Sequence, residues 1–244
     1  MRLFDFSLFA GTDPFSPAIA TADAVARYLD SADARGVITS LAGVFYDYKE
    51  GNRETLALTD QEQRLLSGFV VDPRRIESGF TDWDGVAGRY RAVVLFPALD
   101  AARFHRWPLS HPAVRAIFAN ADKISLPILV HVARSGDATS LAALAREVAV
   151  PVVAMGLAYS AVNEVITGTA DCPNLLFGIR LFAGMDNIEQ LSEHLGAERL
   201  VYDSGEALYS HRAPFRNLME SRINEKAREC IATGNARRIF GDID

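Results

Sequence analysis

Cysteine is scarce in this chain of 244 residues, which contains two, Cys172 and Cys230. They lie far apart and lack the paired spacing of a zinc site or a disulfide framework, so we expect two packing residues. Long apolar runs are also missing, since none reaches the roughly 18 residues that cross a bilayer. A basic stripe is missing as well, because 31 Asp and Glu residues exceed 25 Lys and Arg residues and the net charge is -6. The sequence therefore predicts a cytoplasmic protein that binds neither nucleic acid nor a membrane.

What the chain does contain is a series of short apolar runs separated by segments of helical periodicity. The runs cover residues 3–9, 37–40, 68–73, 91–97, 126–132, 150–154, 174–179 and 199–203. Strands that alternate with helices form right-handed βαβ units, which makes the strands parallel. We predict an α/β fold in which residues 1–244 form a single-domain TIM-type (β/α)8 barrel, a fold that typically needs roughly 250 residues. The alternative is an open doubly wound sheet, which is weakened because no glycine-rich phosphate-binding turn follows any run.

Residues 41–62 form a polar segment between the second and the third apolar run. The segment is longer than a tight connection and contains Tyr46. Long loops in compact domains commonly cover a functional site, so we expect a lid insertion at 41–62. A disordered excursion is the alternative.

The apolar run at 126–132 organises these expectations because it contains a histidine near its carboxyl end. A continuous apolar run of this length, followed by a turn at Gly136-Asp137, is typical of a strand that is buried on both faces. Ligands bind at the carboxyl ends of parallel strands, so His131 lies where chemistry would take place. The alternative is a core histidine whose ring nitrogens bond to a neighbouring side chain.

Five segments of the chain, taken in order, resemble the amidohydrolase superfamily. They are residues 4–9, the His111-Pro112 pair that begins a helix, and residues 126–131, 196–204 and 234–240. The resemblance is to the amidohydrolase-2-like branch of small metal-dependent hydrolases and decarboxylases, and it covers most of the chain. It implies a (β/α)8 barrel whose strand ends carry histidines and an aspartate. In that family these residues bind one or two divalent metals that activate a water molecule.

Most of the family's metal ligands are replaced in this chain. The family ends its first strand in Asp-x-His-x-His, and the matching residues here are Asp5, Ser7 and Phe9. The fifth strand keeps His131. The remaining positions differ as well, with no Gly-His pair at 154–156, Ser204-Gly205 in place of Ser-Asp, and no lysine at 95–97. A catalytic divalent ion needs about three protein ligands, so we predict no bound metal and no other cofactor.

Protein side chains are then the candidates for chemistry. Residues two apart on a strand share a face, so Asp5 and Asp203 are expected to point into the barrel from neighbouring strands. Ionising both of two neighbouring carboxyl groups costs free energy, so one of them should have a raised pKa. Together with His131 they form an acid/base set of catalytic residues that needs no metal. Arg180, after the seventh run, is expected to anchor a carboxylate or phosphate of the substrate.

Three further residues are candidates for substrate binding, namely Ser7, Glu206 and Tyr46. The catalytic candidates also have structural alternatives. Asp5 could hold the first turn of the chain or a buried arginine, and Asp203 could cap a loop. Arg180 could instead pair with Asp203 as a structural ion pair.

Two functions fit these observations. The first is an amidohydrolase-like hydrolase or lyase that acts on a small, carboxylated molecule without the usual metal centre. The second is a catalytically inactive relative that serves as a binding module or as a partner subunit. Several polar residues are expected at the strand ends, and a relative that had lost its activity would not need such a cluster. This cluster therefore favours the enzyme. Besides the substrate, the expected partner is a second copy of the chain or an active homologue.

Overall fold

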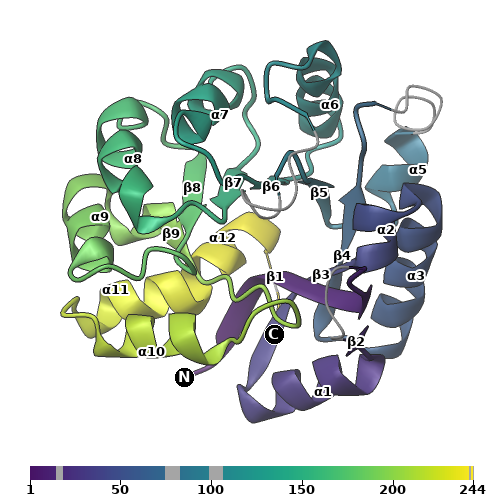
Figure 1. Ribbon diagram of the computed structural model, residues 1–244, viewed down its shortest axis with the longest axis horizontal. Helices are drawn as coiled ribbons and strands as arrows, with labels where there is room; N and C mark the ends of the chain where they lie inside the picture. Colours follow the sequence, from purple (N-terminus) through teal and green to yellow (C-terminus); the bar gives the residue numbers. More distant parts are fainter. Residues whose placement is uncertain (15–18, 75–82, 99–106, 242, 244) are drawn as a thin grey trace.

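The computed structural model describes residues 1–14, 19–74, 83–98, 107–241 and 243, and its centre is a nearly closed barrel of parallel strands (Figure 1). The barrel strands are β1 (Leu3–Thr12), β3 (Ala34–Ser40), β4 (Leu65–Val70), β5 (Ala92–Leu95), β6 (Ile128–His131), β7 (Val152–Met155), β8 (Leu175–Gly178) and β9 (Leu200–Val201). Each strand pairs in parallel with the next one in this order. The ring is completed where the Phe6 N–H donates to the Tyr202 carbonyl oxygen at 3.0 Å. The predicted TIM-type barrel is therefore confirmed.

Helices surround the strands in Figure 1. They are α1 (Ala22–Ser31), α2 (Leu41–Phe45), α3 (Tyr48–Gln61), α5 (Trp83–Ala87), α6 (Pro112–Lys123), α7 (Asp137–Ala145), α8 (Val162–Gly168), α9 (Asn187–Leu195), α10 (Arg212–Glu220), α11 (Glu225–Glu229) and α12 (Asn235–Phe240). Short helical turns lie at Tyr159–Ala161, Ala197–Arg199 and Cys230–Gly234. A short strand that the sequence did not predict, β2 (Ile19–Ala20), pairs antiparallel with the end of β1. Within the described ranges, no helix has the length and apolar character that a membrane crossing requires.

The barrel strands are apolar on both faces because each face packs into a different core. Leu95 and Val130 belong to the core between the strands and the helices. Val94 and Leu129, their neighbours in the chain, belong to a second core inside the barrel. Alternation along a strand places successive side chains on opposite faces. A strand of this kind therefore appears in the sequence as a continuous apolar run.

Helix α12 closes the amino-terminal end of the barrel. The Phe240 ring lies 5.3 Å from the ring of Phe4 and 5.6 Å from that of Phe6, measured between centroids. The Arg91 guanidinium donates to the Phe240 carbonyl oxygen at 2.7 Å. In Figure 1, α12 (yellow) accordingly lies across the middle of the ring. With one end sealed by aromatic packing, the carboxyl ends of the strands are the open end where a site can form.

Residues 41–62 fold into α2 and α3, so the alternative of a disordered excursion is wrong, and the predicted lid segment is helical rather than a loop. Gly51 of α3 lies so close to the backbone of Gly43 in α2 that an added Cβ would come within 2.0 Å of it. Asn52 of α3 donates to the Val70 carbonyl oxygen at 2.9 Å and accepts from the Val70 N–H at 2.8 Å. The segment is thus the helical connection between β3 and β4.

The expectation that Asp5 points into the barrel is also wrong. The pairing of β1 with β3 shifts its register between Asp5 and Leu8. An extra residue in a strand reverses the face on which later side chains lie. Phe9 therefore faces the barrel interior, whereas Asp5 accepts a hydrogen bond at 2.7 Å from Tyr28, a residue of the core beneath the helices.

Candidate active site

The carboxyl end of the barrel gathers three of the predicted site residues: His131, Arg180 and Asp203. Each follows or ends a barrel strand at a position that faces inward, because the residues just before them, among them Val130 and Tyr202, belong to the outer core. All three side chains are buried. The structure thus places these three side chains at the same end of the barrel.

His131 ends β6 inside an aromatic cluster. Its imidazole stacks on the Phe96 ring with centroids 4.4 Å apart and planes inclined by 12°, and the Phe9 ring lies 5.5 Å away. Its Nδ1 atom is buried and has no hydrogen-bond partner among the described residues. Burial, together with the nearby positive charge of Arg180, holds the pKa of His131 well below its usual value. The imidazole is therefore neutral at neutral pH, with Nδ1 able to accept or donate one hydrogen bond.

Arg180 and Asp203 form a buried ion pair. The Asp203 Oδ1 atom accepts from the Arg180 backbone N–H at 2.8 Å. Its Oδ2 atom lies 3.5 Å from the Arg180 Nε atom, which is longer than an ordinary hydrogen bond. Burial raises the pKa of the Asp203 carboxyl, although the Arg180 charge opposes this shift. Within the described residues, Arg180 Nε, Arg180 Nη1 and Asp203 Oδ2 are all buried without a hydrogen-bond partner.

Three glycines at successive strand ends make room for this pair. A Cβ added to Gly178 would lie 2.5 Å from the Asp203 Oδ1 atom. One added to Gly156 would lie 3.4 Å from the Arg180 Nη2 atom, and one added to Gly205 would lie 3.1 Å from Arg180 Nε. Gly156 and Gly205 also have φ values of +89° and +69°, which favour glycine. The sequence thus keeps side chains away from the carboxylate and the guanidinium.

Asp5 has a structural role instead. Its Oδ1 atom accepts from the backbone N–H groups of Ser7 (3.1 Å) and Ser204 (2.9 Å), and its Oδ2 atom accepts from the hydroxyls of Tyr28 and Ser204. Burial raises the pKa of this carboxyl to about 7 despite these four hydrogen bonds. The side chain joins β1, α1 and the chain after β9, so it holds the ring closed where β1 meets β9.

The remaining substrate-binding candidates differ in position. Ser7 is buried in β1, and its Oγ atom has no hydrogen-bond partner within the described residues. Glu206 instead accepts from the His211 backbone N–H at 2.7 Å and pairs with the His211 ring at 3.1 Å. Tyr46 is 58% exposed at the end of α2. The Glu206 backbone carbonyl accepts from the Phe9 N–H at 2.6 Å, so Glu206 borders the cluster, whereas its carboxylate is bonded to His211.

Two groups of residues in the site were missed from the sequence. Phe9 and Phe96 enclose His131, and Tyr209 lies over the Arg180 guanidinium, with Cζ 4.2 Å from the ring centroid. Phe96 directly follows β5 and could have been found from the inward register of that strand, whereas Phe9 lies beyond the register shift in β1. Tyr209 lies in a polar turn, where no sequence pattern marks it.

The residues present do not fit the divalent metal that the resemblance implies. Across the described ranges, no group of three or more His, Cys, Asp or Glu side chains is arranged to hold a metal ion. Near His131, the two ring contacts come from Phe9 and Phe96, and the neighbouring charge is the Arg180 cation. Aromatic rings are not metal ligands, and a guanidinium repels a cation.

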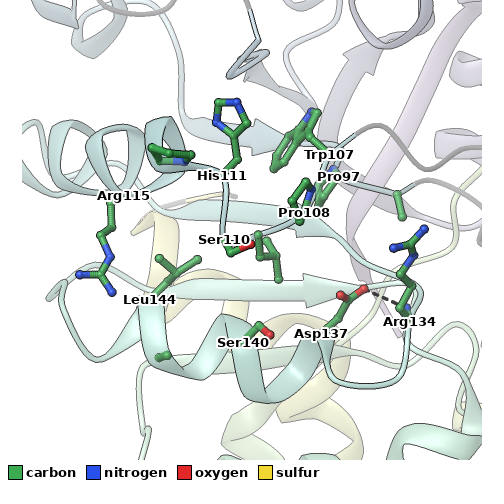
Figure 2. A pocket seen from close by; sticks show the side chains of 14 residues that line it. Pro97, Trp107, Pro108, Ser110, His111, Arg115, Arg134, Asp137, Ser140 and Leu144 are labelled. Atoms are coloured by element: carbon green, nitrogen blue, oxygen red, sulfur yellow. Dashed lines mark hydrogen bonds between the residues drawn. The ribbon is translucent and has the colours of Figure 1, made fainter.

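A pocket of about 430 Å³ lies beside this cluster (Figure 2). It is lined by Pro97, Ala98, Trp107, Pro108, Leu109, Ser110, His111, Pro112, Arg115, Arg134, Asp137, Ser140, Ala143 and Leu144. Trp107, Leu109 and Leu144 belong to the outer core. The pocket borders the site where the Ala98 N–H donates to the His131 carbonyl oxygen at 3.2 Å. It therefore lies between α6 and α7, outside the barrel interior.

Sequence comparisons identify no relative. No protein-family model matches the chain, and no curated protein matches it either.

Solved structures, in contrast, share its fold over nearly the whole chain. An uncharacterized TIM-barrel protein from Bordetella bronchiseptica superposes with a TM-score of 0.76 at 14% identity, covering 100% of this chain and 99% of the other. A dihydroxybenzoic acid decarboxylase from Polaromonas, solved with manganese and the inhibitor 2-nitroresorcinol, gives 0.76 at 10% identity, covering 98% and 96%. A probable 2-pyrone-4,6-dicarboxylic acid hydrolase from Acinetobacter baumannii, solved with citric acid bound, gives 0.72 at 15% identity, covering 99% and 100%. The chain thus has the fold of these barrels.

Proposed function

We propose that this protein is a metal-independent hydrolase or lyase that acts on a small carboxylated molecule at the carboxyl end of the barrel. One observation carries the proposal: within the described residues, two buried nitrogens of Arg180, Nε and Nη1, have no hydrogen-bond partner, and neither have Asp203 Oδ2 and His131 Nδ1. The structures that share the fold include a decarboxylase and a probable hydrolase whose names refer to carboxylated compounds.

A carboxylate fits Arg180 better than a neutral group does. A buried donor without a partner costs roughly 1–3 kcal/mol, and more when it is charged. The planar guanidinium presents adjacent N–H groups that match the two oxygens of a carboxylate. Nε and Nη1 lie on opposite edges of the guanidinium and have no hydrogen-bond partner among the described residues, so each can donate to an oxygen of the ligand.

Asp203 and His131 provide the acid and the base. Burial raises the pKa of Asp203, which makes it the better proton donor of the two groups. The lowered pKa of His131 keeps its ring neutral, so Nδ1 accepts a proton from water. In hydrolysis, the water oxygen adds to the substrate carbonyl carbon while its proton goes to His131, and the Asp203 proton goes to the leaving oxygen. In a lyase reaction, the Asp203 proton goes to the carbon from which CO₂ departs.

Turnover of a small panel of substrates tests the proposal. Benzoates, benzenedicarboxylates and carboxylated lactones are incubated with protein treated with a chelator, and products are followed by proton NMR. We expect turnover of at least one compound that is insensitive to the chelator. It should fall by about 10²–10⁴-fold in His131→Ala and Asp203→Asn, the usual range for an acid or a base. Turnover by both variants at the parent rate would show that the site is wrong.

A second candidate function is a binding module without catalysis, which also suits a partner subunit of an active homologue. The packing of His131 favours it, because the imidazole is only 3% exposed and stacks directly on Phe96. In that case the panel shows carboxylate binding that depends on Arg180 but no turnover.

A further inference from the structure

We propose that Tyr209 positions the Arg180 guanidinium and thereby sets the affinity of this site for a carboxylate. The inference rests on the proposed anion site, since it concerns how the anchor of that site is held. Tyr209 lies in the turn after β9, and neither its sequence context nor the resemblance assigns it a role.

The first support is the contact itself. The Arg180 Cζ atom lies 4.2 Å from the centroid of the Tyr209 ring, within the range of a cation–π interaction. The ring covers one face of the guanidinium, whose N–H groups point outward in its own plane. The edge is where carboxylate oxygens bind.

The second support is the backbone beneath the ring. The N–H of Tyr209 donates to the Gly205 carbonyl oxygen at 2.9 Å, which closes the turn. A Cβ added to Gly205 would lie 2.7 Å from Tyr209 Cδ2 and 3.1 Å from Arg180 Nε. The absence of a side chain at Gly205 therefore lets the ring and the guanidinium pack together.

The third support is how little else holds Arg180. Its contact with the Asp203 carboxylate is 3.5 Å long, and Nε and Nη1 have no hydrogen-bond partner in the described part of the chain. An arginine head group that is held by few hydrogen bonds retains rotamer freedom. The Tyr209 ring is thus the contact that fixes the plane of the guanidinium before a ligand binds, which lowers the entropic cost of binding.

The experiment compares Tyr209→Leu and Tyr209→Met, which remove the aromatic face, with Tyr209→Phe, which keeps it. Tyr209 is half-buried on a turn, and Met fills its space with a flexible chain, so a folded variant is available for the test. Isophthalate is titrated calorimetrically into each protein. The Arg180 Nε–Hε resonance, assigned by its loss in Arg180→Lys, is recorded as well.

We expect roughly 2-fold to 30-fold weaker isophthalate binding in the Leu and Met variants, the range of a cation–π contact expressed as affinity. The Phe variant should bind within about twofold of the parent. The Hε resonance should lose its ring-current shift in the Leu and Met variants only, an effect that a change in stability would not produce.

Two outcomes overturn the inference and can be told apart. Parent-like binding and an unmoved Hε resonance in all three variants would refute the role of Tyr209 and leave the anion site intact. Failure of the parent protein itself to bind isophthalate would refute the anion site, and the role of Tyr209 in it as well.

Discussion

Replacement of Asp5 by asparagine tests how the barrel is closed where β1 meets the chain after β9. This junction, formed by Asp5, Tyr28 and Ser204, is called the seam below. Asp5 is fully buried, and its two oxygens accept from two backbone N–H groups and two hydroxyls. Asparagine can keep all four hydrogen bonds, because its carbonyl oxygen serves the backbone donors and its amide donates to the hydroxyls, which rotate to accept. The substitution therefore removes the ionisable group and keeps the seam.

The magnitude follows from the pKa of Asp5, which burial raises from 3.8 to about 7. Between these values the unfolded chain loses the proton and the folded chain keeps it. The contribution of Asp5 to stability is therefore full below pH 3.8, falls as the pH rises, and is lost above about pH 7. At 1.36 kcal/mol for each pKa unit, the loss amounts to about 4 kcal/mol. Asp5→Asn has no such dependence.

Urea unfolding followed by circular dichroism measures the difference. The free energy of unfolding of Asp5→Asn minus that of the parent should rise by about 4 kcal/mol between pH 4 and pH 8. The subtraction cancels the other carboxyl groups. Asp5→Ala is the control for the seam, since it leaves two buried N–H groups unpaired and should cost roughly 2–6 kcal/mol relative to Asp5→Asn. A difference between Asp5→Asn and parent that is constant with pH would refute the reasoning.

Three further predictions concern the ends of the barrel. Phe240→Ala should lower the free energy of unfolding by about 3–5 kcal/mol in urea, because the ring seals the amino-terminal end, and should leave isophthalate affinity unchanged; loss of affinity would contradict the separation of the two ends. Gly178→Ala should weaken isophthalate binding at least tenfold in calorimetry, because the added Cβ would lie 2.5 Å from Asp203 Oδ1. Parent-like binding would show that the Arg180–Asp203 ion pair does not lie against β8. Isophthalate binding should be coupled to proton uptake and should weaken as the pH rises, because a second anion beside Arg180 further raises the pKa of Asp203. Calorimetry in buffers of different ionisation enthalpy detects the uptake. Its absence would argue against Asp203 as the acid.

The barrel could be predicted because its strands are buried on both faces. Such strands appear as continuous apolar runs, and β6 and β8 were recognised from this property alone. Residues 41–62 were misjudged because α3 is polar and its packing depends on Gly51 lying directly against Gly43. A contact of that kind leaves no local pattern in the sequence.

Part of the site could be predicted from the alternation of side chains along the strands. His131, Arg180 and Asp203 could be placed from strand ends and alternation. Asp5 could not, because β1 is apolar on both faces and gives no signal of its register shift. Tyr209 could not either, because its contact with Arg180 is made by a turn whose path only the folded chain defines.

The central claim is that side chains at the carboxyl end of the barrel, and not a bound cation, perform the function of this protein. Its most direct test is the metal content of protein purified without a chelator and measured by mass spectrometry of the elements. We expect no transition metal in stoichiometric amount, in the parent and in His131→Ala alike. One tightly held metal ion for each chain in the parent, absent from His131→Ala, would contradict it.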